Sequence, residues 1–209
     1  MKIQTYTPEF EDSWLRCKLL SYFYTSFYAD VETSKTTFDG RPTIELIAVE
    51  NGIVVGFLDM VLDTEELKTS FLGDGLGAFL KTLAVHPDYQ SQGIGRKLYE
   101  TALNELETTP IEFIELYTRG DEPANHFYKK LGFELLLETY DVFGMEKSKR
   151  KPITLTGIKN KKLQAIFEDG ETCDYIMVDS VFEVYDRKAL DKIDYERYYP
   201  SRGYYKKIK

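Results

Sequence analysis

Residues 90–96 have a spacing of glycine and polar side chains that suits the binding of an anion. They read Gln90-Ser91-Gln92-Gly93-Ile94-Gly95-Arg96 and lie between an apolar strand, residues 79–85, and a helix with leucines on one face, residues 96–106. Two glycines at the first turn of a helix have no Cβ atoms, so a ligand can come close to the backbone. The N–H groups and the positive end of the helix dipole there favour a negative charge. The segment predicts a phosphate-binding loop; the alternative is a turn that uses glycine for packing alone.

Two common phosphate-binding patterns do not fit Gly93 and Gly95. The Walker A pattern needs Gly-x-x-x-x-Gly-Lys-Ser/Thr, and the dinucleotide fingerprint needs Gly-x-Gly-x-x-Gly. The order Leu-Ala-Val-His-Pro and then Gln90-x-x-Gly93-x-Gly95 instead resembles motif A of the GNAT superfamily of acyl-CoA N-acyltransferases. The resemblance implies that the loop amides hold the pyrophosphate of coenzyme A, and that the end of the preceding strand pairs with the pantetheine arm. The residues implied to bind the cofactor are Leu83, Ala84, Val85, Gln90, Ser91, Gln92, Gly93, Ile94, Gly95 and Arg96.

A second match lies downstream, at residues 123–133. It contains Phe127-Tyr128-Lys129-Lys130-Leu131-Gly132-Phe133 and resembles motif B of the same family, a helix that ends at a glycine. Gly132 suits a left-handed helix cap, with Phe133 folding back as its apolar contact. The resemblance implies that Tyr128 lies beside the sulfur of coenzyme A and donates a proton to the departing thiolate. Taken alone, Tyr128 would be interpreted as a half-buried core tyrosine; the presence of both motifs in this order favours the catalytic role.

The motif B helix departs from the family pattern at one position. Many members carry an asparagine seven residues before the tyrosine, and this chain has Asp121 there. Asn125 lies three residues before Tyr128, and helical spacing places Asp121, Asn125 and Tyr128 on one face. We therefore expect Asn125 to serve instead in binding coenzyme A.

Acyl transfer to an amine needs a polarised thioester carbonyl, a neutral amine and a proton donor for the thiolate. The resemblance assigns the first task to the strand amides and the last to Tyr128. The general base stays open because the strand stretch 78–82 carries no acid. Cys17 has no histidine in a pattern that indicates a dyad, so we expect direct transfer in a ternary complex. The candidates for the base are Asp59, Asp74, Glu115, His126 and a chain of water molecules.

The two motifs together predict an N-acetyltransferase, an acyltransferase that moves the acetyl group of acetyl-CoA to a primary amine, with no metal. The sequence does not identify the amine acceptor. One alternative is a non-catalytic acyl-CoA-binding module with a sensing or assembly role. Another is the transfer of a longer acyl group.

The elements that must position these motifs follow the order of the GNAT fold. A strand over residues 2–6 is followed by a helix to about residue 24, with Thr7 as its N-cap. Two further strands, 43–49 and 53–62, are joined at Asn51-Gly52, a strong hairpin pattern. We predict an α+β (α/β) fold with a mixed central sheet flanked by helices. The later elements are a strand at 111–118, the motif B helix at 121–131 and one or two strands at 134–145.

The pattern changes after a basic, proline-ended stretch at residues 148–152. We predict a GNAT domain over residues 1–149 and a small β-rich extension over residues 150–209. A core of some 60 residues is marginal, so we expect the extension to pack on the first domain or on a second subunit, as in a homodimer. Its expected elements are strands at 153–158, 163–167, 172–178 and 181–185, a weak helix at 187–195, and an aromatic and basic tail at 198–207.

Composition limits the function classes. The chain has 209 residues, 43% of them hydrophobic, and a net charge of −8 that is concentrated in residues 1–149. An acidic domain attracts cationic substrates and repels nucleic acid, which agrees with an amine acceptor and no nucleic-acid partner. No apolar run is long enough for a membrane span, so we expect a soluble, cytoplasmic protein. Cys17 and Cys173 lack metal-ligand spacing and are expected to be reduced.

Overall fold

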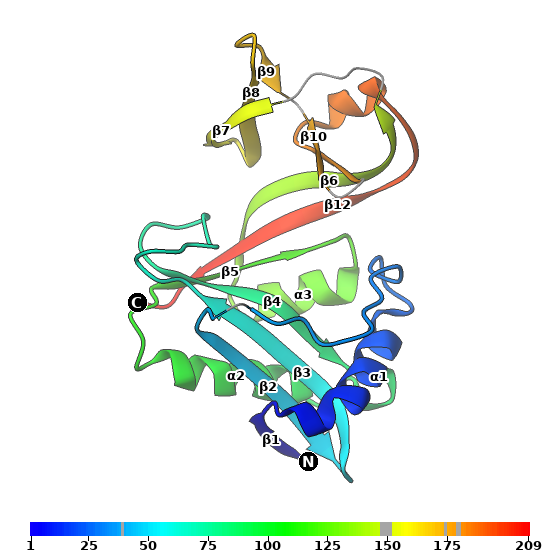
Figure 1. Ribbon diagram of the computed structural model, residues 1–209, viewed down its shortest axis with the longest axis vertical. Helices are drawn as coiled ribbons and strands as arrows, with labels where there is room; N and C mark the ends of the chain where they lie inside the picture. The colour runs from blue at the N-terminus through cyan, green and yellow to red at the C-terminus, as the bar shows by residue number, and fades with distance from the viewer. Residues whose placement is uncertain (39, 147–151, 174, 179–180) are drawn as a thin grey trace. The chain divides into compact units, whose positions relative to one another are not determined.

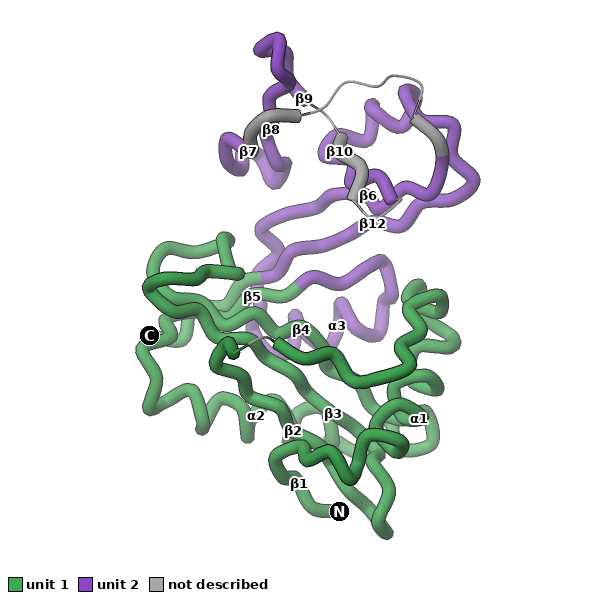
Figure 2. Tube along the Cα trace, viewed as in Figure 1, with its two compact units in different colours: residues 1–116, 205–209 green, residues 117–204 purple. Residues whose placement is uncertain are grey.

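The computed structural model forms two compact units, which are described separately (Figure 2). Unit 1 comprises residues 1–116 and 205–209, and unit 2 comprises residues 117–204. The structure describes residues 1–38, 40–146, 152–173, 175–178 and 181–209.

Unit 1 is a sheet with helices on both faces (Figure 1). The strand order is β1-β2-β3-β4-β5, antiparallel except for the parallel pair β4 and β5. The α+β fold with a mixed central sheet that the sequence predicts is therefore confirmed. The elements are β1 (Lys2–Thr5), the 3-10 helix η1 (Pro8–Phe10), α1 (Glu11–Tyr22), β2 (Thr43–Glu50), β3 (Ile53–Leu62), β4 (Gly77–Val85), the 3-10 helix η2 (Pro87–Tyr89), α2 (Ile94–Leu106) and β5 (Phe113–Thr118), whose last two residues belong to unit 2.

Neighbouring residues of β3 show how the two helices are held. Phe57 points to α1, where its ring lies 4.8 Å from that of Trp14. Gly56 points to α2, because a Cβ atom on it would lie 3.1 Å from Ile94 Cγ2. Successive strand residues face opposite sides of a sheet, so α1 and α2 cover opposite faces. The predicted hairpin is also confirmed, since Asn51 and Gly52 have φ angles of 51° and 81°.

The end of the chain returns to unit 1. The Tyr205 ring lies 5.3 Å from that of Phe113. The N–H groups of Ile208 and Lys209 both donate to the carbonyl oxygen of Glu112. The last five residues therefore help to hold the edge of the unit 1 sheet at β5.

Unit 2 contains the motif B helix and most of the C-terminal strands. Within it, β12, β6, β11 and β10 are neighbours in one sheet, and β7, β8 and β9 form another. A core of Val142, Phe182, Val184, Leu190 and Ile193 lies between the first sheet and η3. The elements are α3 (Glu122–Lys130), β6 (Glu134–Glu146), β7 (Pro152–Lys159), β8 (Lys162–Phe167), β9 (Thr172–Cys173), β10 (Tyr175–Val178), β11 (Val181–Val184), the 3-10 helix η3 (Arg187–Lys192) and β12 (Ile193–Lys207), whose last three residues belong to unit 1.

The helix predicted at 187–195 is confirmed only as the short 3-10 helix at 187–192, and the predicted tail at 198–207 is wrong. The helical turn ends at Lys192, and residues 193–207 form β12, the longest strand of the described chain. Aromatic residues favour strands, and Gly144 of β6 lets β12 come close, since a Cβ atom there would lie 2.6 Å from Tyr195 Cα. The strands predicted at 153–158, 163–167 and 181–185 are confirmed by β7, β8 and β11. The predicted strand at 172–178 corresponds to β9 and β10.

Residues 148–151 of the predicted basic boundary lie outside the described part of the chain. The predicted division into domains 1–149 and 150–209 therefore stays a prediction. Among the helices that the structure describes, none combines the length and the apolar character that crossing a membrane requires.

Candidate functional site

Hydrogen bonds fix the loop between β4 and α2 to the end of the sheet. The His86 N–H donates to the carbonyl oxygen of Val55, and the Gln90 side chain donates to that of Val85 at 3.1 Å. Gly93 caps α2 in the left-handed conformation, with φ of 79°. A Cβ atom on Gly93 would meet nothing within 4 Å, so the space beside its backbone is open. Glycine is needed here for the φ angle and leaves room for a ligand.

Ile94 anchors the first turn of α2. Its side chain is buried against Gly56, and Leu98 lies beside it. The neighbouring residues face solvent: Gly95 is partly exposed, and the exposed ones are Ser91, Gln92, Gly93 and Arg96. The first four N–H groups of a helix have no acceptor within the helix. A rigid turn that presents such groups on an exposed surface can bind an anion such as a phosphate.

The end of β4 lies beyond its paired stretch with β5. That pairing runs from Gly77 opposite Phe113 to Phe79 opposite Glu115, whereas β4 continues to Val85. Ala84 is buried, and Leu83 and Val85 are partly exposed. Within unit 1 the last residues of β4 therefore have backbone groups on this edge that β5 does not use, which suits pairing with an extended ligand.

Tyr128 lies on α3 in unit 2 and is 8% exposed. Its ring contacts those of Phe127 and Phe133 edge-on, at centroid distances of 5.5 Å and 5.9 Å. The helix ends as predicted: Gly132 has φ of 85°, its N–H donates to Lys129 O, and the Phe133 N–H donates to Tyr128 O. Burial raises the pKa of Tyr128 above its usual value of 10, so the phenol keeps its proton at neutral pH.

Asn125 is 2% exposed, and its amide is engaged inside unit 2. Its Nδ2 donates to the carbonyl oxygens of Arg119 and Asp121, at 2.7 Å and 2.8 Å. Its Oδ1 accepts from the Tyr204 hydroxyl at 2.8 Å. These bonds tie the start of α3 to β12, and a role in binding coenzyme A stays a prediction.

The four candidate bases lie in different surroundings. Glu115 is fully buried, and its Oε2 accepts hydrogen bonds from the N–H groups of Phe71 and Leu72. Its carboxylate therefore holds the backbone of the loop between β3 and β4. Burial raises its pKa, and the two N–H groups partly offset this. Asp74 and His126 are exposed. Asp59 is 3% exposed and belongs to a polar network inside unit 1.

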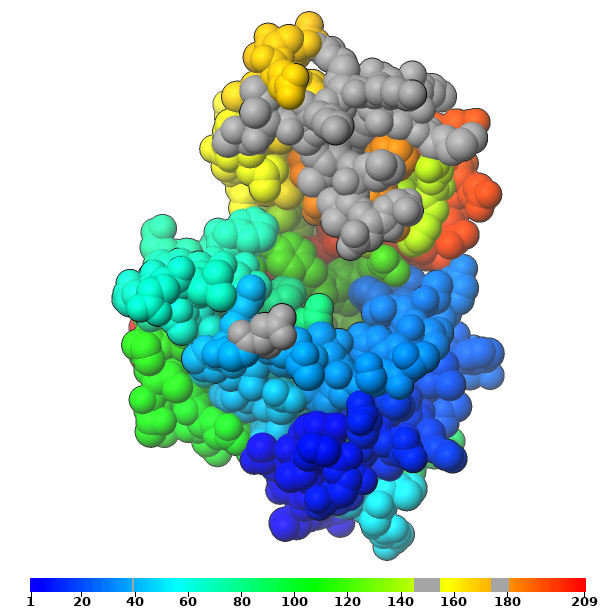
Figure 3. All heavy atoms as spheres, in the orientation of Figure 1, coloured from blue at the N-terminus to red at the C-terminus, as the bar shows by residue number. Residues whose placement is uncertain are grey.

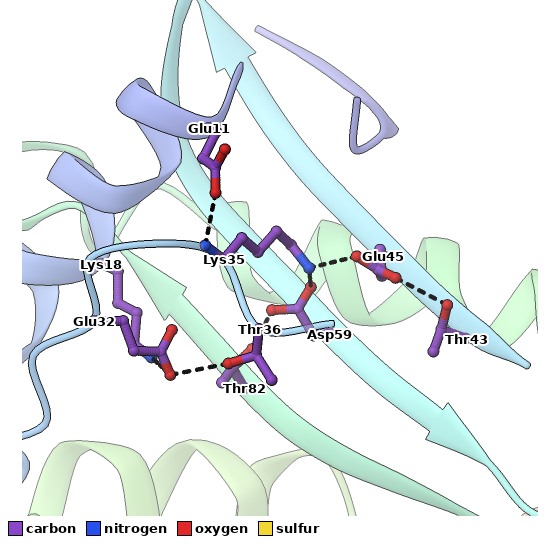
Figure 4. A network of polar contacts seen from close by, with 9 residues as sticks. All are labelled: Glu11, Lys18, Glu32, Lys35, Thr36, Thr43, Glu45, Asp59 and Thr82. Carbon is purple, nitrogen blue, oxygen red and sulfur yellow. Dashed lines mark hydrogen bonds and ion pairs between the residues drawn. The ribbon is translucent and has the colours of Figure 1, made fainter. Parts of the chain in front are cut away.

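That network joins the irregular segment 23–42 to the sheet (Figure 4). The Lys35 ammonium donates to Glu45 and lies 3.0 Å from Asp59 Oδ1, and Asp59 Oδ2 accepts from the Thr82 hydroxyl at 2.6 Å. Burial raises the pKa of Asp59, and Lys35 and Thr82 partly offset this. The sequence singled out only Asp59. Lys35 and Glu45 were missed because no short pattern links residues that meet only through the fold.

Comparison with known proteins agrees with these features. The model of the acetyltransferase (GNAT) family matches residues 4–133. The uncharacterized N-acetyltransferase ycf52 of Pyropia yezoensis is 29% identical over 91 residues, which are 42% of this chain and 51% of that protein. The ribosomal protein bS18-alanine N-acetyltransferase of Escherichia coli (strain K12) is 42% identical over 57 residues, 27% of this chain and 38% of that protein. The chain spans about half of the length of the first of these relatives and less than half of the second.

Two solved structures share the fold over nearly the whole chain. The protein smu.2055 from Streptococcus mutans has 18% identity and a TM-score of 0.55, with 100% of both chains covered. An acetyltransferase from Streptococcus agalactiae has 19% identity and a TM-score of 0.53, with 99% of this chain and 98% of that chain covered. At this identity they show the fold alone.

Proposed function

This chain belongs to the acetyltransferase (GNAT) family and is an acyltransferase, and from that premise we propose that it transfers an acetyl group from acetyl-CoA to a primary amine. The observation that carries the proposal is the left-handed Gly93 at the start of α2, with open space beside its backbone. Nothing in the local packing asks for that space, and a pyrophosphate would use it.

We assign the pyrophosphate of coenzyme A to residues 90–96 and the pantetheine arm to residues 83–85. The amides of the first turn of α2 and its dipole stabilise the negative charge. The free edge of β4 offers main-chain partners to the amides of the pantetheine arm. These two features are consecutive in the chain, so one extended ligand can use both.

The proposed reaction is direct transfer in a ternary complex. The neutral amine attacks the thioester carbonyl, a bond from nitrogen to carbon forms, and the bond from carbon to sulfur breaks. The Tyr128 phenol gives its proton to the thiolate, and a base takes the excess proton of the amine. Asp59 and Glu115 have internal partners in this structure, so Asp74, His126 or water suits the base better.

An assay of free thiol with a panel of primary amines tests this function. We expect thiol release from acetyl-CoA that depends on the amine, with one acetylated amine formed for each thiol. Thiol release without acetylated amine would indicate a hydrolase. Binding of acetyl-CoA with no release for any amine would favour a non-catalytic module and contradict the proposal.

A further inference from the structure

A lysine side chain of unit 1 lies where a free alkylammonium ion could bind. The Lys35 side chain is 5% exposed, and its ammonium contacts the carboxylates of Glu45 and Asp59. The same Nζ lies 4.8 Å from the ring centre of Tyr6 and 5.5 Å from those of Trp14 and Phe38. Carboxylates together with aromatic rings are a general means of binding ammonium groups. We call Tyr6, Trp14, Glu45 and Asp59 the ammonium cluster; Phe38 lies on the same segment as Lys35 and is not counted in it.

The cluster and the lysine belong to different kinds of structure. Glu45 lies on β2, Asp59 on β3 and Trp14 on α1, all regular elements of the sheet and its helix cover. Lys35 lies on segment 23–42, which has no helix or strand in its described part. Figure 3 shows this segment, in blue, lying over one face of unit 1. The framework thus forms most of the binding groups, and an irregular segment supplies the cation.

Side chains of α1 hold the segment near Lys35 through polar contacts. The Lys35 N–H donates to Glu11 Oε1 at 2.8 Å, and Lys18 of α1 lies 2.7 Å from Glu32 of the segment. Hydrogen bonds to charged groups are worth about 1.5–3 kcal/mol each. A competing cation could therefore displace the segment without disturbing the sheet.

The cluster adjoins the strand that we assign to the acyl arm of the cofactor. Asp59 lies opposite Thr82 of β4 and accepts a hydrogen bond from its hydroxyl. The register of β3 and β4 shifts here, because Met60 lies opposite Leu80 and Lys81 has no partner in β3. Thr82 directly precedes Leu83, the first residue assigned to the pantetheine arm. A ligand that contacts Asp59 is thus close to Thr82, the residue of β4 that directly precedes those assigned to the pantetheine arm.

Two carboxylates face one lysine in the cluster, and they keep the bound group charged. Burial alone would lower the pKa of Lys35, but the charges and hydrogen bonds of Asp59 and Glu45 outweigh it and raise the pKa. An amine held in this place is therefore an ammonium ion, which cannot attack a thioester. An acceptor bound here needs a second amino group to react.

We propose that the ammonium cluster binds one end of an acceptor with two amino groups on an alkyl chain, and that Lys35 occupies the cluster when the acceptor is absent. This rests on the proposed acetyl transfer. The second amino group of the acceptor is the one that reacts. Lys35 is an internal competitor, and segment 23–42 is displaced when the acceptor binds.

Binding of 1,4-diaminobutane, measured by calorimetry without acetyl-CoA, tests the proposal separately from the transfer reaction. Lys35→Met removes the ammonium and keeps an apolar stem, so we expect about tenfold tighter binding than in the wild type, because the competing state is gone. Lys18→Met is the comparison variant: Lys18 is equally buried and holds the same segment through Glu32, but Lys35 stays in the cluster, so binding should tighten clearly less than in Lys35→Met. Butane-1,4-diol, which carries no charge, should not bind to either variant.

The wild type gives a second measurement that needs no variant to fold. Saturating 1,4-diaminobutane should speed hydrogen exchange at residues 23–38, whereas butane-1,4-diol should not. Equal affinity of Lys35→Met and the wild type, or unchanged exchange, would overturn the proposal and leave an internal ion pair. Acetyl transfer to other amines would in that case still support the proposed function.

Discussion

The loop before α2 and the ammonium cluster both belong to unit 1, but they are built in different ways. The loop uses the backbone of consecutive residues, 86–96, and the conformation of one glycine. The cluster uses side chains that extend along the chain from Tyr6 to Asp59 and meet only in the folded sheet. A site made of local backbone can be recognised from a short pattern, whereas a site made of distant side chains needs the structure.

The largest expected effect is on the stability of the cluster. Asp59→Asn leaves the Lys35 ammonium buried with Glu45 as its remaining charged partner. Breaking a buried ion pair by removing one partner costs about 3–5 kcal/mol. We expect a loss of about 3 kcal/mol in the free energy of unfolding, because Glu45 compensates in part. Urea unfolding followed by circular dichroism measures it.

An exposed carboxylate of the same unit is the control. Asp74→Asn changes an exposed side chain and should alter the free energy of unfolding by no more than about 0.5 kcal/mol. If both variants lose the same small amount, the cluster contributes no more than a surface charge. The distinction between a loop built from backbone and a cluster built from buried side chains would then be wrong.

The next effect is on turnover and concerns a buried side chain of unit 2. Tyr128→Phe keeps the ring packing and removes the phenol proton, so the turnover number should fall by roughly 10²-fold with the affinity for coenzyme A unchanged. Tyr185→Phe is the control, since Tyr185 is also a buried tyrosine of unit 2 whose pKa burial raises. Its turnover should match the wild type. A Tyr128→Phe rate within a factor of about two of the wild type would point to water as the proton donor.

The smallest effect concerns the two cysteines. Cys17 and Cys173 are both buried thiols that are 1% exposed, and burial raises the pKa of the Cys17 thiol to about 12. The thiolate is the reactive form, so at about pH 8 a thiol reagent should label neither residue in the folded protein and both in guanidinium chloride. Rapid labelling of Cys17 in the folded protein would show that α1 opens away from the sheet.

Much of the fold was predictable because its signals are local. Asn51-Gly52 predicted the hairpin, Gly132 the end of α3, and the glycines of residues 90–96 the start of α2. Each of these positions needs a backbone conformation that few residues adopt. The sequence alone was therefore sufficient to find the loop and the helix that carry the proposed chemistry.

The rest depends on contacts between distant parts of the chain. Residues 198–207 look like an aromatic and basic tail, but they belong to β12 because Gly144 leaves room for the strand beside β6. Lys35 looks like a solvated loop residue, and its burial depends on carboxylates that β2 and β3 bring together. Neither arrangement follows from periodicity, because the partners are ten or more residues away.

The central claim is that the backbone at the start of α2 binds the pyrophosphate of coenzyme A. Gly93→Val combines backbone strain at φ of 79° with a side chain in the open space beside the loop. Gly52→Val is the matched control, because Gly52 has φ of 81° and equally open surroundings in the hairpin and therefore carries the same strain.

Calorimetry with coenzyme A that carries no acyl group compares these two variants most directly. We expect Gly52→Val to bind like the wild type, and Gly93→Val to bind at least about 100-fold more weakly, because the branched side chain blocks the approach of the phosphates to the amides. Equal affinity of the wild type and both variants would contradict the account.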